Sequence, residues 1–258
     1  MTQSPSYRRI LTRMGYYNYQ NGLISRHLNQ EDSWAYHLDQ SRKFIIKAIE
    51  LYSPEKITVL GSGWLLDFPM AELAERTSKI YLIDIVHPPD VIKQVSIFNN
   101  IELIEQDVTG GLIGEVWQRW SNYTFFSRPQ TLKNLIVPDY KSAADPGMVI
   151  SLNILTQLES LIIDFIRKRS KVKEEEFDIL RTEIQKKHIE FLNKYKSVLI
   201  TDYEEVITGK HGVEKIVPTL FTGLPSGRLI EKWTWNFDSK GVDLYNSRSK
   251  LKVIAIIN

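Results

Sequence analysis

The chain has no cysteine. This excludes disulfides, thiolate metal sites, cysteine nucleophiles and iron–sulfur clusters. The five histidines are scattered without the spacing of metal ligands, so we expect no metal site. Neither sign of charge dominates, since the chain has 33 Lys and Arg residues and 31 Asp and Glu residues. The composition therefore gives no support to a nucleic-acid partner held through its phosphates.

Long apolar runs are also missing. No stretch approaches the roughly 18 apolar residues that a membrane span needs. The first residues show no charged-then-apolar signal peptide. We therefore expect a cytoplasmic protein with no membrane segment, and the sequence leaves its oligomeric state open.

The 258 residues, 43% hydrophobic and 25% charged, suffice for one large α/β domain with a helical addition. Residues 1–30 show no clear period. From Asp32 onward, apolar side chains recur at helical spacing, and Asp32 or Ser33 could cap that helix. We divide the chain into an N-terminal helical cap over 1–54 and a main domain over 55–258.

The main domain alternates short apolar segments with helical ones. We expect helices at 68–76 and 90–98. Short apolar strands separated by helices indicate a parallel sheet that is covered on both faces. The last two strands leave no room for a helix between them and should pair as an antiparallel hairpin. The seven predicted strands are 56–60, 79–85, 101–105, 147–152, 197–201, 228–237 and 251–257.

Three segments interrupt this alternation. Residues 117–146 are long, aromatic and irregular, which is typical of a lid or a binding loop. Residues 155–195 predict an insertion of two helices with a charged joint. Residues 209–227 contain four glycines and two prolines and predict a loop.

A glycine turn, Gly61-Ser62-Gly63, follows the first predicted strand. Glycine lets a backbone approach a ligand closely. Asp84 ends the second strand, where a carboxylate can accept hydrogen bonds from both hydroxyls of a ribose. Asp107 follows the third strand, beside the place of an adenine amino group, although it could equally form a turn. Ligands of open α/β sheets bind at these carboxyl ends.

With these residues in place, the sequence resembles the class I S-adenosylmethionine-dependent methyltransferases over residues 56–257, and a bacterial group of methyltransferase-like proteins over 61–86. The matching segments are Val59–Leu65 for the glycine motif, Ile83-Asp84, Gln106-Asp107-Val108, and Ser151–Leu158 after the fourth strand. Two positions depart from the family pattern, because Val59 replaces its first acid and Leu65 its third glycine. Asp67 could supply the missing carboxylate, or could cap the helix expected at residue 68.

The resemblance implies a Rossmann-like, seven-stranded mixed sheet in the order 3-2-1-4-5-7-6. It also implies S-adenosylmethionine as the cofactor and methyl transfer to an unidentified acceptor, for which we favour a small molecule. The cofactor-binding residues that it implies are Gly61, Ser62, Gly63, Asp67, Asp84, Ile85, Asp107, Val108 and Asn153. Asn153 could line the methionine end of the cofactor or merely end its strand.

Methyl transfer from a sulfonium demands mainly alignment, and a base only for acceptors of high pKa. The candidates for such a base are Asp202, Tyr203 and Glu204 after the fifth strand, and His211 in the glycine-rich loop. Three alternatives stay open. They are a non-catalytic protein that binds S-adenosylmethionine or S-adenosylhomocysteine, an NAD-dependent oxidoreductase, and an aminopropyl transferase on the same type of sheet.

Overall fold

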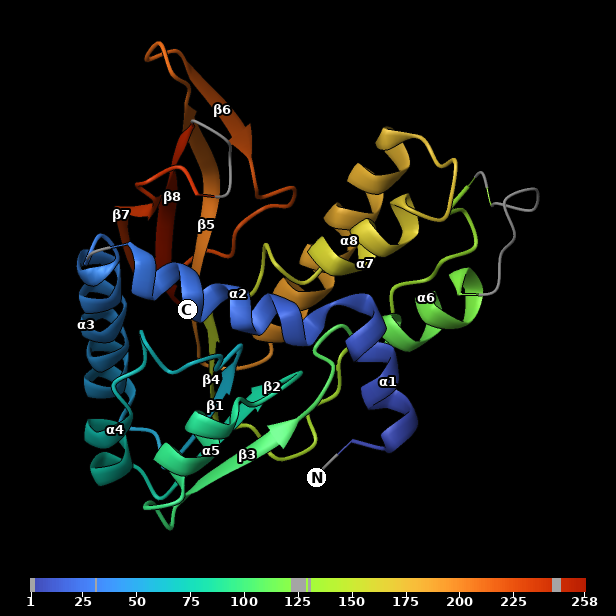
Figure 1. The fold of residues 1–258 in the computed structure, drawn as a ribbon. Helices are drawn as coiled ribbons and strands as arrows, with labels where there is room; N and C mark the ends of the chain where they lie inside the picture. The colour runs from blue at the N-terminus through green and yellow to red at the C-terminus, as the bar shows by residue number, and fades with distance from the viewer. Residues whose placement is uncertain (1–2, 31, 122–128, 130, 243–246) are drawn as a thin grey trace.

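A computed structural model describes residues 3–30, 32–121, 129, 131–242 and 247–258 (Figure 1). The chain folds around one mixed sheet with helices on both of its faces. Its strands are β1 (Lys56–Leu60), β2 (Lys79–Asp84), β3 (Ile101–Glu105), β4 (Met148–Leu152), β5 (Ser197–Thr208), β6 (Glu214–Pro218), β7 (Leu229–Asp238) and β8 (Arg248–Ile257). Its helices are α1 (Pro5–Met14), α2 (Tyr16–Asn29), α3 (Ala35–Tyr52), α4 (Met70–Arg76), α5 (Pro89–Val95), α6 (Leu112–Trp120), α7 (Ser160–Arg167) and α8 (Glu174–Leu192).

The strand order is β3-β2-β1-β4-β5-β8-β7. The first five of these strands run parallel, and β8 lies antiparallel between β5 and β7. This confirms the predicted fold class and strand order, with the closing hairpin as the last two strands. An N-terminal set of helices precedes the sheet, and α7 and α8 form the expected helical pair within 155–195.

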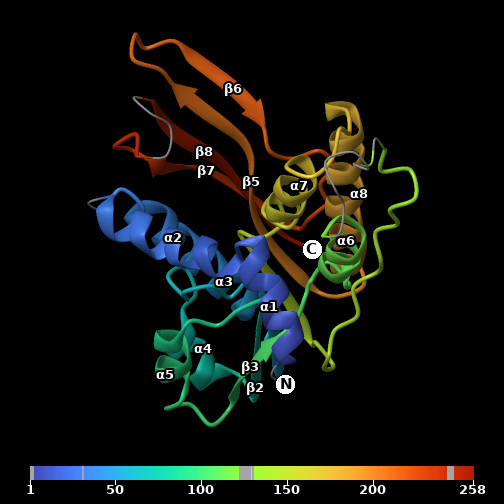
Figure 2. The same ribbon diagram turned by 45° about the vertical axis from the view of Figure 1, so that its right-hand side comes forward.

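The prediction of a plain loop over 209–227 is wrong. β6 lies inside that range and pairs antiparallel with an extension of β5 that runs to Thr208, well past the predicted end. Residues Asp202–Glu205 of this extension form a polar run, so the apolar pattern of the sequence does not predict a strand there. The backbone hydrogen bonds of the extension are nevertheless supplied by β6 and β8. Both ribbon views show β6 projecting beyond the helical layers (Figures 1 and 2).

Alternate residues of the strands face two separate apolar layers. In β1, Val59 packs in the layer formed with α3, α4 and α5, whereas Leu60 packs in the layer formed with α1, α6, α7 and α8. Both side chains are fully buried. The sheet is thus covered on both faces, as its apolar strands predict, and its carboxyl edge is left for a site.

The N-terminal region is more regular than its sequence indicates. Ser4 caps α1 by accepting a hydrogen bond from the Tyr7 N–H at 3.3 Å, and Gly15 ends that helix at φ +95°. α2 follows at once. The helix expected from Asp32 begins at Ala35 with no side-chain cap, so the predicted cap by Asp32 or Ser33 is wrong.

The aromatic segment 117–146 is partly helical, since Trp117 and Trp120 belong to α6. The aromatic residues that the sequence places at 123, 125 and 126 lie outside the described residues.

Candidate functional site

The glycine turn leaves β1 in a conformation that favours glycine. Gly61 has φ +79°, and an added Cβ would lie 2.7 Å from the Ile154 Cβ and 2.9 Å from the Leu152 oxygen. The Gly61 N–H donates to the Ile83 carbonyl at 2.9 Å, which ties the turn to β2. Gly63 has φ +48°. The turn thus presents its backbone beside the ends of β1, β2 and β4.

Asp84, the last residue of β2, holds the turn. Its Oδ2 accepts the Gly63 N–H at 2.7 Å, and its Oδ1 accepts the Ile85 N–H at 2.7 Å. Oδ1 also accepts Nε2 of Gln20, from α2, at 3.3 Å. Burial raises the pKa of Asp84, while the charge of His87 and the backbone N–H groups offset part of that rise.

Asp107 lies after β3 and forms the turn that the sequence allowed. Its Oδ1 accepts the N–H and the hydroxyl of Thr109 at 2.8 and 2.5 Å. Its Oδ2 faces the Tyr7 hydroxyl of α1 at 3.3 Å and the Ile113 N–H at 3.4 Å. Burial raises the pKa of Asp107, and these hydrogen bonds lower it in part. The turn role does not prevent this carboxyl from lining a pocket.

Asn153 follows β4 with φ +50° and joins the half-buried Asp67 to the buried His37. Its amide donates to Oδ2 of Asp67 at 2.6 Å and lies 3.0 Å from Nε2 of His37. Trp233 donates to the other ring nitrogen of His37 at 3.0 Å, and burial lowers the pKa of His37 to about 3. Asp67 does not cap a helix, because α4 begins at Met70 after Pro69. Burial raises the pKa of Asp67.

A single cavity of about 150 Å³ lies against all nine residues that the sequence predicts as cofactor-binding. They are Gly61, Ser62, Gly63, Asp67, Asp84, Ile85, Asp107, Val108 and Asn153. The structure therefore brings the predicted set together at the carboxyl ends of β1 to β4.

Sequence reasoning missed the aromatic and apolar part of this lining. Those side chains come mainly from α2, α3 and β7, and no local motif marks them, because tertiary packing brings them to the cavity. They include Tyr16, Tyr19, Leu23, Trp34, Leu38 and Trp235. The cluster of tyrosines at residues 16 to 19 was the one visible signal.

Two properties of the lining have chemical consequences. Of the described residues that line the cavity, three are aspartates and none is Lys, Arg or His. Among these same residues, Tyr16 Oη, Gln20 Oε1, Ser62 Oγ and Asn153 Oδ1 are buried polar atoms without a hydrogen-bond partner. Buried polar groups normally find partners, so these four atoms indicate a place for a polar ligand.

Helix α2 closes the cavity. Nε1 of Trp64, in the turn, donates to the Gln20 carbonyl at 2.8 Å, and the Tyr19 hydroxyl donates to Gln157 at 3.2 Å. The cavity is smaller than the about 300 to 1,000 Å³ of typical ligand pockets. A cofactor of nucleoside size would therefore require α2 to move outward.

The four candidate bases lie elsewhere. Asp202, Tyr203 and Glu204 lie within β5 rather than after it, and His211 is exposed in the turn before β6, so the predicted positions of the first three are wrong. Asp202 is buried and accepts the Thr156 hydroxyl at 2.6 Å. The four are not among the described residues that line the cavity.

Within the described ranges, no group of three or more His, Asp or Glu side chains is placed to hold a metal ion. The helices in those ranges also include none that is long and apolar enough to cross a membrane.

No protein-family model and no curated protein matches the sequence. Among solved structures, the fold is similar to DhpI in complex with S-adenosylhomocysteine, at 8% identity and TM-score 0.36, over 96% of this chain and 97% of that one. It is similar to the 1,6-didemethyltoxoflavin-N1-methyltransferase of Burkholderia thailandensis, at 9% identity and TM-score 0.39, over 100% and 92%. It is also similar to the 23S rRNA methyltransferase ErmE, at 12% identity and TM-score 0.30, over 84% and 68%. The strand order and the antiparallel β8 of the chain itself give it the Rossmann-like fold of class I methyltransferases.

Proposed function

We propose that the cavity binds S-adenosylmethionine and that the protein is a methyltransferase acting on a small molecule. One observation carries this proposal: the lining combines three aspartates with five tyrosine and tryptophan side chains and, among its described residues, no cationic one. A sulfonium is a cation, and aromatic faces and carboxylates both stabilise cations.

The same lining disfavours a nicotinamide dinucleotide, whose pyrophosphate is anionic. In dinucleotide folds the glycine turn opens directly into a helix, and the N-terminus of that helix binds the pyrophosphate. Here α4 begins only at Met70, and Asp67 lies between the turn and the helix. The helix dipole therefore does not act at Gly63.

The residues present fit the proposed cofactor. Asp84 would accept the ribose hydroxyls, and Asp107 or the backbone near Val108 would face the adenine. The unpartnered Ser62 Oγ and Asn153 Oδ1 would receive partners from the methionine moiety. Gly61 lets the turn pack closely against Leu152 and Ile154, where an added Cβ would overlap with both residues.

The cofactor supplies an electrophilic methyl group. A lone pair of the acceptor forms the new bond to the methyl carbon, the sulfur–carbon bond breaks, and its electron pair stays on sulfur to give S-adenosylhomocysteine. The protein aligns the acceptor and excludes water. Because the four candidate bases lie outside the cavity lining, we propose an acceptor that needs no protein base, with its proton leaving to solvent.

A non-catalytic protein that binds the same cofactor is the second candidate, since Val59 and Leu65 depart from the family motif. The two are separated by turnover. A methyltransferase transfers labelled methyl groups to some member of an acceptor panel, whereas a binding protein binds the cofactor and transfers none.

Calorimetric titration with S-adenosylhomocysteine and with NAD tests the cofactor assignment. We expect S-adenosylhomocysteine to bind and NAD not to bind. Asp84→Ala should weaken S-adenosylhomocysteine at least about tenfold, since hydrogen bonds to a charged group contribute about 1.5–3 kcal/mol. The matched control Asp90→Ala, at an exposed position of α5, should bind like the unmodified chain. Tight NAD binding without binding of S-adenosylhomocysteine would contradict the proposal.

A further inference from the structure

A second hollow lies beside the cofactor cavity. It has a volume of about 440 Å³ and lies between α2, the end of α1, and α7 with the two residues that follow it. Tyr19, Leu23 and Leu161 line both the hollow and the cavity. The two spaces therefore share a wall, and a molecule in the hollow lies next to the proposed cofactor.

The hollow is cationic, in contrast to the cavity. Its lining includes Arg13, Arg26, Lys168 and Arg169, and Asp164 is the carboxylate among its described lining residues. With four cationic side chains and one carboxylate, the formal charge of this set is +3, whereas the net charge of the whole chain is +2. Positive charge is thus concentrated in this hollow.

Arg169 is held in the hollow by two contacts. Its guanidinium carbon lies 3.7 Å from the centre of the Phe165 ring, and its Nη1 donates to the Phe165 carbonyl at 3.2 Å. Partial burial lowers the pKa of Arg169. Two contacts therefore fix the planar group on the wall of the hollow.

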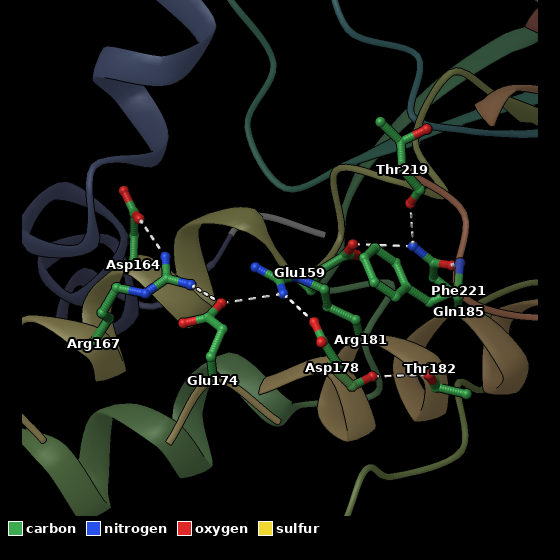
Figure 3. Close-up of polar contacts among 10 residues, drawn as sticks. All are labelled: Glu159, Asp164, Arg167, Glu174, Asp178, Arg181, Thr182, Gln185, Thr219 and Phe221. Atoms are coloured by element: carbon green, nitrogen blue, oxygen red, sulfur yellow. Dashed lines mark hydrogen bonds and ion pairs between the residues drawn. The ribbon is translucent and has the colours of Figure 1, made fainter. Parts of the chain in front are cut away.

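Neighbouring cations are neutralised, but Arg169 is not. Figure 3 shows Arg167 between Asp164 and Glu174, at 3.8 and 2.6 Å. Over the described part of the chain, neither Arg169 nor Arg13 has a carboxylate within ion-pairing distance. A guanidinium without a counter-ion at the wall of a hollow is available to an anion, and charge-assisted hydrogen bonds from arginine to a carboxylate or phosphate are among the strong ones.

We propose that the hollow between α2 and α7 holds an anionic group, a carboxylate or a phosphate, of the methyl acceptor. This inference rests on the proposed function and specifies its substrate class. The anion pairs with Arg169 and Arg13, and the rest of the acceptor extends past Tyr19 and Leu161 toward the cofactor. The acidic cavity and the cationic hollow thereby separate a cationic cofactor from an anionic acceptor.

Calorimetric titration with inorganic pyrophosphate and with succinate tests the inference and distinguishes the two anions. We expect at least one of them to bind saturably, and Arg169→Gln to weaken it about tenfold or more. Arg169→Lys, which keeps the charge, should recover part of the affinity. The matched control Arg76→Gln removes the same charge from α4 and should leave binding unchanged.

Two results would overturn the inference: saturable binding of neither anion, or equal weakening by Arg76→Gln and Arg169→Gln. Binding of S-adenosylhomocysteine is measured on the same samples. We expect Arg169→Gln to leave it unchanged, which also shows that the variant is folded. A failure of the unmodified chain to bind S-adenosylhomocysteine would contradict the proposed function and not the anion site, so the two failures are distinguishable.

Discussion

The side chain of Gln20 makes the hydrogen bond to Asp84 that the ribose of the proposed cofactor would make. Its Nε2 donates to Oδ1 of Asp84 at 3.3 Å, and its own Oε1 is buried without a hydrogen-bond partner in the described structure. The cofactor must displace this contact before Asp84 can accept the ribose hydroxyls. We therefore predict that Gln20→Ala strengthens the binding of S-adenosylhomocysteine.

The size of the effect follows from the length of the contact. At 3.3 Å, the bond lies beyond the usual range for N–H donors, so a net value of about 1 kcal/mol is appropriate. Removing it should lower the dissociation constant about fivefold. The α2 contact from Trp64 to the Gln20 backbone persists, because it does not involve the side chain.

Calorimetry on Gln20→Ala measures this effect. Because alanine is also the better helix former, Asn21→Ala, at an exposed position of α2, serves as the matched control and should bind like the unmodified chain. An affinity for Gln20→Ala that equals or falls below that of Asn21→Ala would refute the reasoning. A lower affinity would show that Gln20 is a ligand of the cofactor rather than its competitor.

Two further predictions concern the turn and a buried acid. Gly61→Ala should lower the free energy of unfolding by about 2–4 kcal/mol, because alanine is strained in the left-handed conformation and its Cβ overlaps with Ile154. Gly63→Ala should lower it by only about 1–2 kcal/mol, because the added Cβ would lie 3.9 Å from its nearest atom and only the strain remains. Urea unfolding measures both, and equal losses would contradict the steric argument. Burial raises the pKa of Glu159 (Figure 3) to about 8, above its unfolded value of 4.5, so its contribution to stability is complete below pH 4.5 and is lost as pH rises through 8. Between pH 6.5 and 8, Glu159→Gln should therefore flatten the fall of stability with pH, and an unchanged slope would show that this carboxyl is ionised in the folded chain.

The sequence predicted the sheet and the polar half of the cavity for one physical reason. Parallel strands end at a common edge, so Asp84, the last residue of β2, and Asn153, the residue after β4, must meet there. The part of the lining that comes from α2 and β7 could not be predicted in this way. Gln20 and Trp235 reach the cavity through packing between segments far apart in the chain, and no local pattern encodes that contact.

At Leu65 the residue type departs from the family motif, but the backbone conformation that the motif requires is retained. Leu65 stands where the family pattern has a third glycine, and it adopts φ +59°. A left-handed leucine costs roughly 1–2 kcal/mol. Its side chain is buried in the layer with α3 and α4, and this burial offsets the cost. The sequence shows the missing glycine, but only the structure shows that the turn is retained.

The most direct test of the central claim is a crystal structure of the chain with S-adenosylhomocysteine. The account predicts that the adenosyl group lies in the cavity between the ends of β1 and β3, with the ribose hydroxyls on Asp84 and with α2 shifted so that Gln20 no longer contacts that carboxylate. S-adenosylhomocysteine bound at another place, or a cavity that stays closed by Gln20 at saturating ligand, would contradict it.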